Sequence, residues 1–106
     1  MENMADVEVT IEPEVDEELE VKEPNMWLVI FHDDDKTSME FVIMLLMQLF
    51  HKTMSEATEL MLQVHNEGSA TVGRYTHEVA EEKMNTGVRT ARAYGFPLNI
   101  SIEEDV

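Results

Sequence analysis

The feature that most constrains the fold is an almost continuous apolar segment, FVIMLLMQLF, at residues 41–50. It is too short to cross a bilayer as a helix, which needs about 20 apolar residues. Thr37 and Glu40 before it have the spacing of a capping box, in which the hydroxyl and the carboxylate satisfy free amides at a helix start. We therefore predict a helix from about 38 to 51. Because only two of residues 39–50 are polar, this helix should be central and packed on most of its surface.

A strand should precede this helix and a second helix should follow it. The run MWLVIFH at residues 26–32 is short and rich in β-formers, which is typical of a strand. Thr53 and Glu56 repeat the capping-box spacing, and Gly68 can supply a left-handed helix end. These signals predict a helix over 54–67 that forms a hairpin with the first.

The remaining sequence predicts a strand, a helix and a strand. SATVGRY at 69–75 has alternating β-branched residues, Thr76 can cap a helix that ends near Tyr94, and LNISIE at 98–103 alternates cleanly. The inner stripe of this third helix should consist of Ala80, Met84, Val88, Ala91 and Tyr94. The predicted fold is α+β, with a small three-stranded antiparallel sheet packed against three helices in the order β-α-α-β-α-β.

Charge divides the chain into two parts. Residues 1–24 contain ten acidic residues, one lysine and no aromatic residue, so they cannot bury enough apolar surface to offset the entropy of ordering. We predict a disordered acidic extension there and one folded domain over 25–106. A chain of 106 residues that is 43% hydrophobic has room for one modest core.

The composition argues against several function classes. A formal charge of −16 repels nucleic acids and anionic membranes. With no cysteine there is neither a disulfide framework nor a thiolate metal site, and the N-terminus does not have the pattern of a secretory signal. We expect a cytoplasmic monomer without a cofactor.

The acidic turn Asp33, Asp34 and Asp35 is the first candidate site. Three adjacent carboxylates can bind a cation such as calcium, hold an ammonium group, act as general acid and base, or cap local amides. No glycine or bidentate glutamate completes a calcium loop, and no nucleophile motif or phosphate loop accompanies the turn. We therefore predict no metal and no enzyme activity.

His65 and the methionines are the second candidate. Met61 lies one turn before His65 on the same helical face, and Met39 opens the first helix directly after the acidic turn. A lone helical histidine is often structural, and methionines often fill cores. An apolar pocket with an acidic rim, however, would bind a ligand that is cationic and apolar at once.

Four segments resemble the ClpS family, the bacterial and plastid adaptors of the N-degron pathway. They are DDKTSMEFV, ATELMLQVHNEG, VAEEKM and PLNISIEE, and the resemblance extends from Trp27 to Glu104. It implies a non-catalytic module that binds proteins through a free N-terminal Leu, Phe, Tyr or Trp. It also implies delivery of these proteins to a Clp-type AAA+ unfoldase, of the ClpA or ClpC class, for degradation.

The resemblance also implies roles for individual residues. The positions that match the α-amine site are Asp33, Asp34, Asp35 and His65. Those that match the side-chain pocket are Phe31, Thr37, Met39, Val42, Met61, Val64 and Leu98, with Met39 excluding β-branched first residues. Glu78 and Lys83 match positions that dock on the unfoldase, and the acidic extension matches a segment that the unfoldase engages.

The chain departs from the family pattern in the acidic turn. Asp33 stands where the family has an asparagine, so an amide donor for a substrate carbonyl is replaced by a negative charge. Lys36 and Ser38 stand where an aromatic residue and a proline are common. An alternative is therefore a ClpS-fold interaction or anti-adaptor protein with an altered pocket.

Overall fold

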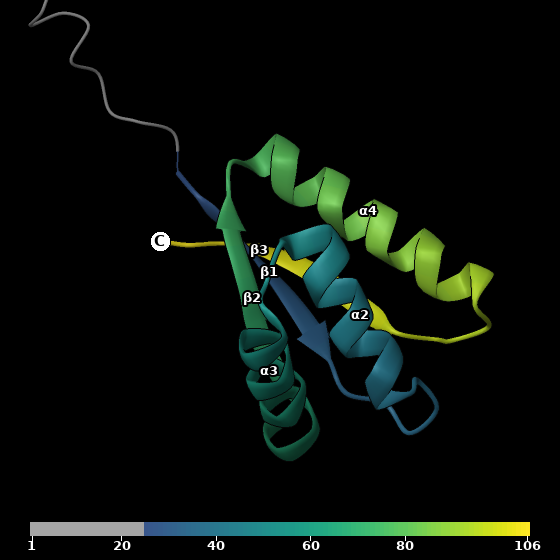
Figure 1. The fold of residues 1–106 in the computed structure, drawn as a ribbon. Helices are drawn as coiled ribbons and strands as arrows, with labels where there is room; N and C mark the ends of the chain where they lie inside the picture. Colours follow the sequence, from purple (N-terminus) through teal and green to yellow (C-terminus); the bar gives the residue numbers. More distant parts are fainter. Residues whose placement is uncertain (1–24) are drawn as a thin grey trace, which may run out of the picture.

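The computed structural model describes residues 25–106, and the prediction for residues 1–24 lies outside this range. The elements, drawn in Figure 1, are β1 (Trp27–His32), α2 (Met39–Phe50), α3 (Met54–Glu67), β2 (Ser69–Tyr75), α4 (His77–Ala93) and β3 (Asn99–Glu104). Their order and type confirm the predicted α+β fold. Among the described residues, no helix combines the length and apolar character needed to cross a membrane.

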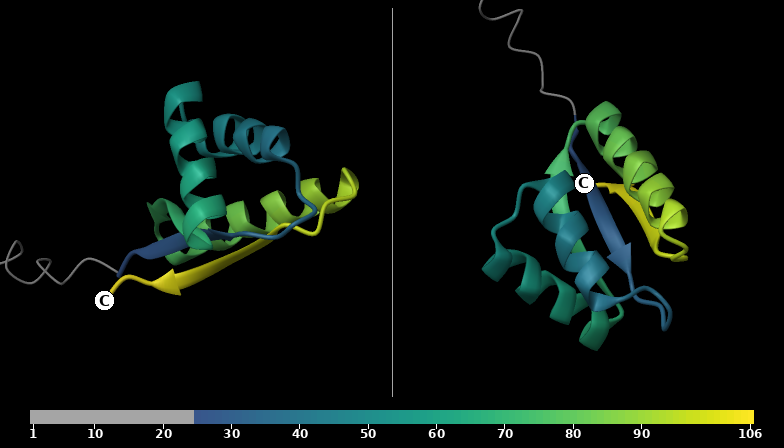
Figure 2. Two further views of the ribbon diagram at one scale, coloured as in Figure 1. Left: turned by 90° about the horizontal axis from the view of Figure 1, so that it is seen from below. Right: turned by 45° about the vertical axis from the view of Figure 1, so that its right-hand side comes forward.

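The sheet is antiparallel, with strand order β2-β1-β3. β1 is central and pairs along its whole length with both neighbours, so that Phe31 lies opposite Ala70 on β2 and Ile100 on β3. Alternate residues of β1, Val29 and Phe31, are completely buried, as expected where side chains point to opposite faces in turn. The helices share one core with the sheet, and Figure 2 (left) shows α2 and α3 above the strands, with α4 running alongside them.

The core fills the space between the sheet and the helices. Its largest fully buried side chains come from β1, α2, β2 and the segment before β3: Phe31, Leu46, Leu98, Val29 and Val72. Each such burial contributes roughly 1.5–3 kcal/mol. The ring of Phe31 meets that of Phe50 edge to face, at a centroid distance of 5.5 Å. This contact joins the central strand to the end of α2.

The predicted cap of α2 is wrong by one residue. Ser38 is the N-cap, and its hydroxyl accepts a hydrogen bond from the amide of Phe41 at 3.1 Å. Thr37 does not cap the helix, because its amide and its hydroxyl both donate to the carboxylate of Asp34. The nearby acid thus offers a stronger acceptor to Thr37 than the helix does.

As expected, α2 packs over most of its surface, but one side of it stays partly open. Its buried residues are Phe41, Val42, Leu45, Leu46 and Phe50. The opposite side is apolar as well, but Ile43, Met44 and Met47 are only partly buried. A three-stranded sheet with two other helices is too small to enclose α2 on every side.

The hairpin between α2 and α3 is as predicted. Thr53 and Glu56 form a complete capping box, with hydrogen bonds of 3.1 Å and 2.9 Å. α3 ends at Gly68, whose φ of 92° lies in the left-handed region that glycine tolerates. Both ends of the helix that carries Met61 and His65 are thereby fixed.

The inner face of α4 differs from the predicted stripe at two positions. Tyr94 is 61% exposed, whereas Gly87 is buried. A Cβ at Gly87 would lie 2.7 Å from Cδ1 of Ile100 on β3, so this glycine permits the helix to approach the sheet closely. Thr76 occupies the N-cap position, but its side chain makes no capping hydrogen bond.

Candidate functional site

The acidic turn, α2 and α3 enclose a cavity of about 260 Å³. Nine residues line it: Asp33, Asp34, Asp35, Thr37, Met39, Val42, Met61, Val64 and His65. The acidic turn directly follows β1, so the central strand of the sheet positions the three acids at the cavity. The apolar side chains of the cavity come from the α2–α3 hairpin. The cavity therefore depends on packing between segments about thirty residues apart in the sequence.

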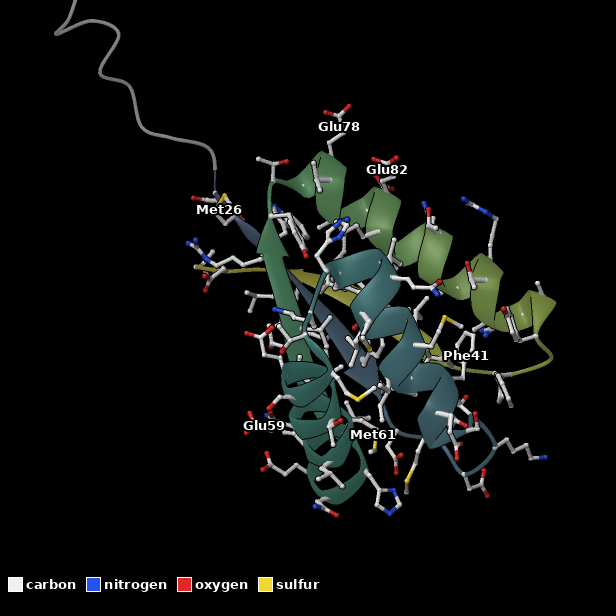
Figure 3. The ribbon with its side chains drawn as sticks, viewed as in Figure 1. Met26, Phe41, Glu59, Met61, Glu78 and Glu82 are labelled. Atoms are coloured by element: carbon white, nitrogen blue, oxygen red, sulfur yellow. The ribbon has the colours of Figure 1, made fainter. Side chains whose placement is uncertain are left out.

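The inner part of the cavity is apolar. Val42, Met61 and Val64 are 6%, 7% and 4% exposed, so their side chains belong to the core. Part of each of these residues also lines the cavity. Figure 3 shows Met61 between α3 and α2. Met39, at the first position of α2, is 44% exposed and marks the opening. A flexible thioether there can adjust to the ligand that enters.

Asp34 holds the turn in shape. Its carboxylate accepts hydrogen bonds from the amides of Lys36 (2.8 Å) and Thr37 (2.7 Å) and from the hydroxyl of Thr37 (2.8 Å). Partial burial acts to raise the pKa of Asp34, but these three hydrogen bonds, together with the positive charge of Arg92, lower it below its ordinary value. Asp34 is therefore ionised at neutral pH, and most of its acceptor capacity is already used.

Asp33 and His65 face each other across the rim. Oδ1 of Asp33 lies 3.8 Å from Nδ1 of His65, and their side chains are 37% and 54% exposed. The amide of Asp33 donates to the carbonyl of Gly68 at 2.9 Å, which ties the turn to the end of α3. This backbone contact brings the two side chains near each other at the rim, where both stay exposed.

Asp35 is the most available acceptor of the turn. It is exposed and lines the cavity, and within the described residues its carboxylate has no hydrogen bond or ion pair of its own. Across residues 25–106, no three His, Asp or Glu side chains are grouped so that they could hold a metal ion. The three acids that line the cavity offer carboxylate acceptors of the kind that a compact cation with several donors binds.

Two of the predicted pocket residues do not line the cavity. Phe31 is 0% exposed and Leu98 is 1% exposed, and both belong to the core. Phe31 is an inward residue of the central strand, and Leu98 directly precedes β3, so the helices cover both completely. Their role in the structure is therefore in the core that the helices and the sheet share.

The two positions assigned to docking lie on α4. Figure 3 shows Glu78 projecting from the outer side of this helix, and Glu82 does the same one turn further on. Lys83 turns inward: its Nζ donates to the carbonyl of Leu49 at 3.0 Å and lies 5.8 Å and 5.5 Å from the ring centroids of Phe50 and Tyr75. Lys83 therefore also has a structural role, at the end of α2.

Sequence reasoning missed Arg92. One of its terminal nitrogens donates to the carbonyls of Phe96 (3.0 Å) and Leu98 (2.9 Å), which fixes the segment between α4 and β3. Its charge also contributes to the lowered pKa of Asp34. The available signal was a basic residue in the last turn of a helix, three residues before a Gly-Phe-Pro-Leu segment.

Comparison with known proteins places the chain in one family. The family model described as "ATP-dependent Clp protease adaptor protein ClpS" matches residues 22–101. The ATP-dependent Clp protease adapter protein ClpS of Lawsonia intracellularis is 45% identical over 92 residues, which are 87% of this chain and 84% of the relative. The protein of the same name from Desulfatibacillum aliphaticivorans is 49% identical over 82 residues, or 77% and 79% of the two chains.

A solved structure agrees with these sequence matches. The structure of Agrobacterium tumefaciens ClpS2 bound to L-phenylalaninamide superimposes with a TM-score of 0.76 at 29% identity, covering 78% of this chain and 100% of that chain. The family match over most of the chain, the two close relatives and the shared fold lead to one conclusion: this protein belongs to the ClpS family of ATP-dependent Clp protease adaptor proteins.

Proposed function

We propose that this protein binds other proteins through a free N-terminal Leu, Phe, Tyr or Trp and delivers them to a Clp-type AAA+ unfoldase in the cytoplasm. The observation that carries the proposal is the cavity itself, which combines a buried apolar interior with an exposed rim of carboxylates and one histidine. Such a cavity recognises an apolar side chain and a nearby ammonium group together. Only the first residue of a protein chain has both.

The size of the cavity supports one side chain as the ligand. Pockets for drug-sized molecules usually measure about 300–1,000 Å³, and this cavity of about 260 Å³ is smaller. The ligand of the related Agrobacterium tumefaciens ClpS2, L-phenylalaninamide, has the required chemistry. It consists of one aromatic side chain, one α-ammonium group and one amide in the place of the next peptide bond.

Each residue that lines the cavity is assigned a part of the ligand according to its contacts and exposure. Asp35 accepts hydrogen bonds from the ammonium, and Asp33 adds negative charge beside it, since both are exposed at the rim. His65 contacts the first peptide group, and Val42, Met61 and Val64 surround the side chain. Asp34 adds negative charge and holds the turn, because three of its approximately four lone-pair sites are already occupied.

Specificity follows from joining the two parts of the site. An internal leucine has no ammonium and would leave the carboxylates without a partner, whereas an N-terminal alanine would leave the apolar interior unfilled. Met39, at the opening, would meet the extra methyl group of a β-branched first residue. Thr37 lines the cavity but donates its hydrogen to Asp34, so it acts through the shape of the turn.

Delivery requires a second surface, which we place on α4. Glu78 projects into solvent there, and Lys83 lies one to two turns along the same helix. The acidic segment 1–24 is the part that we propose the unfoldase engages. The adaptor acts as a monomer and performs no chemical step of its own, so the ATP-driven work belongs to the unfoldase.

The test is a titration of peptides that differ only at their first residue. Leu-initiated peptide should bind, and the same peptide with N-terminal acetylation or with Ala in the first position should bind at least tenfold more weakly. The acetyl group removes the charge and leaves the side chain, whereas Ala does the opposite. Equal binding of all three peptides, or of none, would reject the proposal and favour an interaction protein with an altered pocket.

A further inference from the structure

α2 presents a second apolar surface that is separate from the cavity. A groove of about 390 Å³ is lined by Glu40, Ile43, Met44, Met47, Gln48 and Met54. We call it the α2 groove. Met54 is 63% exposed, and the other apolar residues of the groove are only partly buried. A contiguous apolar groove on a small domain that otherwise carries a charged surface is typical of a binding surface.

The side chains of the α2 groove are suited to ligands of variable shape. Three of its six residues are methionines, whose unbranched and polarisable side chains adapt to different apolar groups. Glu40 stands at the N-terminal end of the groove and disfavours acidic residues there. The groove would thus accept mixed apolar residues rather than one defined side chain.

The α2 groove begins beside the opening of the cavity. Met39 and Val42 line the cavity. The residues that directly follow them, Glu40 and Ile43, line the groove. Consecutive helical residues are turned by about 100°, so the two surfaces occupy adjoining sides of α2. From Glu40 to Gln48 the helix rises by about 12 Å, a length that about four residues of extended peptide would span.

We propose that the α2 groove binds the segment of the captured protein that follows its first two residues, roughly residues three to six, through their apolar side chains. This inference rests on the proposed function of the cavity. A substrate whose first residue is held at Met39 has its next residues beside the groove at a high effective concentration, so that weak apolar contacts add to the affinity.

Charge disfavours the other occupants that the sequence offers. A second copy of the chain carries a charge of −16, equal to that of the first, and residues 1–24 contain ten acidic residues. Both would bring negative charge to a surface whose rim already holds Glu40. A substrate chain needs no net negative charge, and its N-terminus brings a positive one.

The experiment uses the full chain and two peptides that begin with the same Leu-Ser pair. In one peptide, residues three to six alternate Gly and Ser; in the other, two of these positions are Leu. We expect the apolar peptide to bind about tenfold more tightly, because two leucine side chains become partly buried in the groove. In the double variant Met44→Gln, Met47→Gln this ratio should fall to about twofold or less.

Three controls make the result specific. L-phenylalaninamide, which is too short to reach the groove, should bind the double variant as it binds the parent protein. Val79→Gln, which changes a 39% exposed apolar residue on α4, should preserve the tenfold ratio. Met54→Gln, at the far end of the groove and 63% exposed, should lower the ratio without risk to the core.

The outcomes separate the two proposals. Binding of L-phenylalaninamide together with equal affinity for the two peptides would overturn the groove and leave the cavity intact. The groove proposal also fails if the ratio survives in the double variant, or if sedimentation shows self-association that Met44→Gln, Met47→Gln abolishes. If neither L-phenylalaninamide nor any Leu-initiated peptide binds, both proposals fail.

Discussion

Asp33 and Asp34 are adjacent and carry the same functional group, but their surroundings give them different tasks. Asp34 is bound to two amides and a hydroxyl of its own turn, and these bonds keep its pKa low. Asp33 is exposed at the rim, 3.8 Å from His65. One carboxylate therefore shapes the turn, whereas the other stays accessible at the rim.

Replacing Asp33 tests what its charge contributes. Asn at this position would restore an amide donor for the first carbonyl of the substrate and remove one exposed charge. A new hydrogen bond contributes about 1 kcal/mol, whereas one exposed charge contributes less. Asp33→Asn should therefore bind Leu-initiated peptide about threefold more tightly, with a weaker dependence on salt, in calorimetric titrations at two ionic strengths.

Asp35→Asn is the matched control, because it also removes one rim charge. It takes away an acceptor of the ammonium, so we expect weaker binding. Weaker or unchanged binding by Asp33→Asn would show that the third carboxylate itself holds the substrate.

The lowered pKa of Asp34 predicts a specific loss of stability in acid. Because this pKa is lower in the folded chain than in the unfolded chain, the stabilisation is present above the ordinary aspartate pKa and is lost as the pH falls through the folded-state value. The melting temperature of Asp34→Asn should lie below that of the parent protein at pH 7. The difference should shrink between about pH 5 and pH 2. A difference that stays constant over this range would contradict the assignment, and Asp35→Asn should show no such trend.

At the scale of elements, the cavity depends on how the α2–α3 hairpin is fixed over the end of β1. The capping box of Thr53 fixes one end of α3, Gly68 fixes the other, and the amide of Asp33 bonds to Gly68. Lys83 on α4 bonds to the last turn of α2 through the carbonyl of Leu49. These few contacts set the distance between the acidic rim and the apolar interior.

Removal of the Lys83 ammonium should therefore weaken the fold. Lys83→Met deletes the hydrogen bond to Leu49 and the contacts with the Phe50 and Tyr75 rings. We expect a loss of about 1–2 kcal/mol in the free energy of unfolding, measured by urea denaturation. Glu78→Gln, an exposed change on the same helix, should leave stability unchanged. If both variants lose unfoldase binding but only Lys83→Met loses stability, then α4 both docks on the unfoldase and stabilises the fold.

At the scale of the whole molecule, the acidic charge should affect how fast the proposed N-terminal ligand is captured. A chain with a charge of −16 attracts a protonated N-terminus over distances longer than any contact. Added salt should therefore slow the association of Leu-initiated peptide severalfold between about 50 and 500 mM salt, and change its dissociation much less. Stopped-flow fluorescence separates the two rates. An equal change in both would place the charge effect in the bound complex instead.

Local sequence signals were reliable where local chemistry decides the structure. The capping box at Thr53, the left-handed end at Gly68 and the alternation in the strands each need only neighbouring residues. The cap of α2 failed because a competing acceptor, Asp34, lies three residues before Thr37. The residue pattern gave a cation site only as one of several alternatives, and the resemblance to the ClpS family supplied the residue roles.

What the sequence determined by itself is the set of elements, their order and the segments that resemble the family. These follow from short-range periodicity, capping and turn chemistry, which act within a few residues along the chain. Only the tertiary structure decided that Phe31 and Leu98 are buried in the core, that Lys83 turns inward, and that one side of α2 stays open as a groove. The reason is that burial is a property of the whole packed domain. A residue's hydrophobicity states a preference for the interior, but the number of neighbours available to cover it sets the outcome.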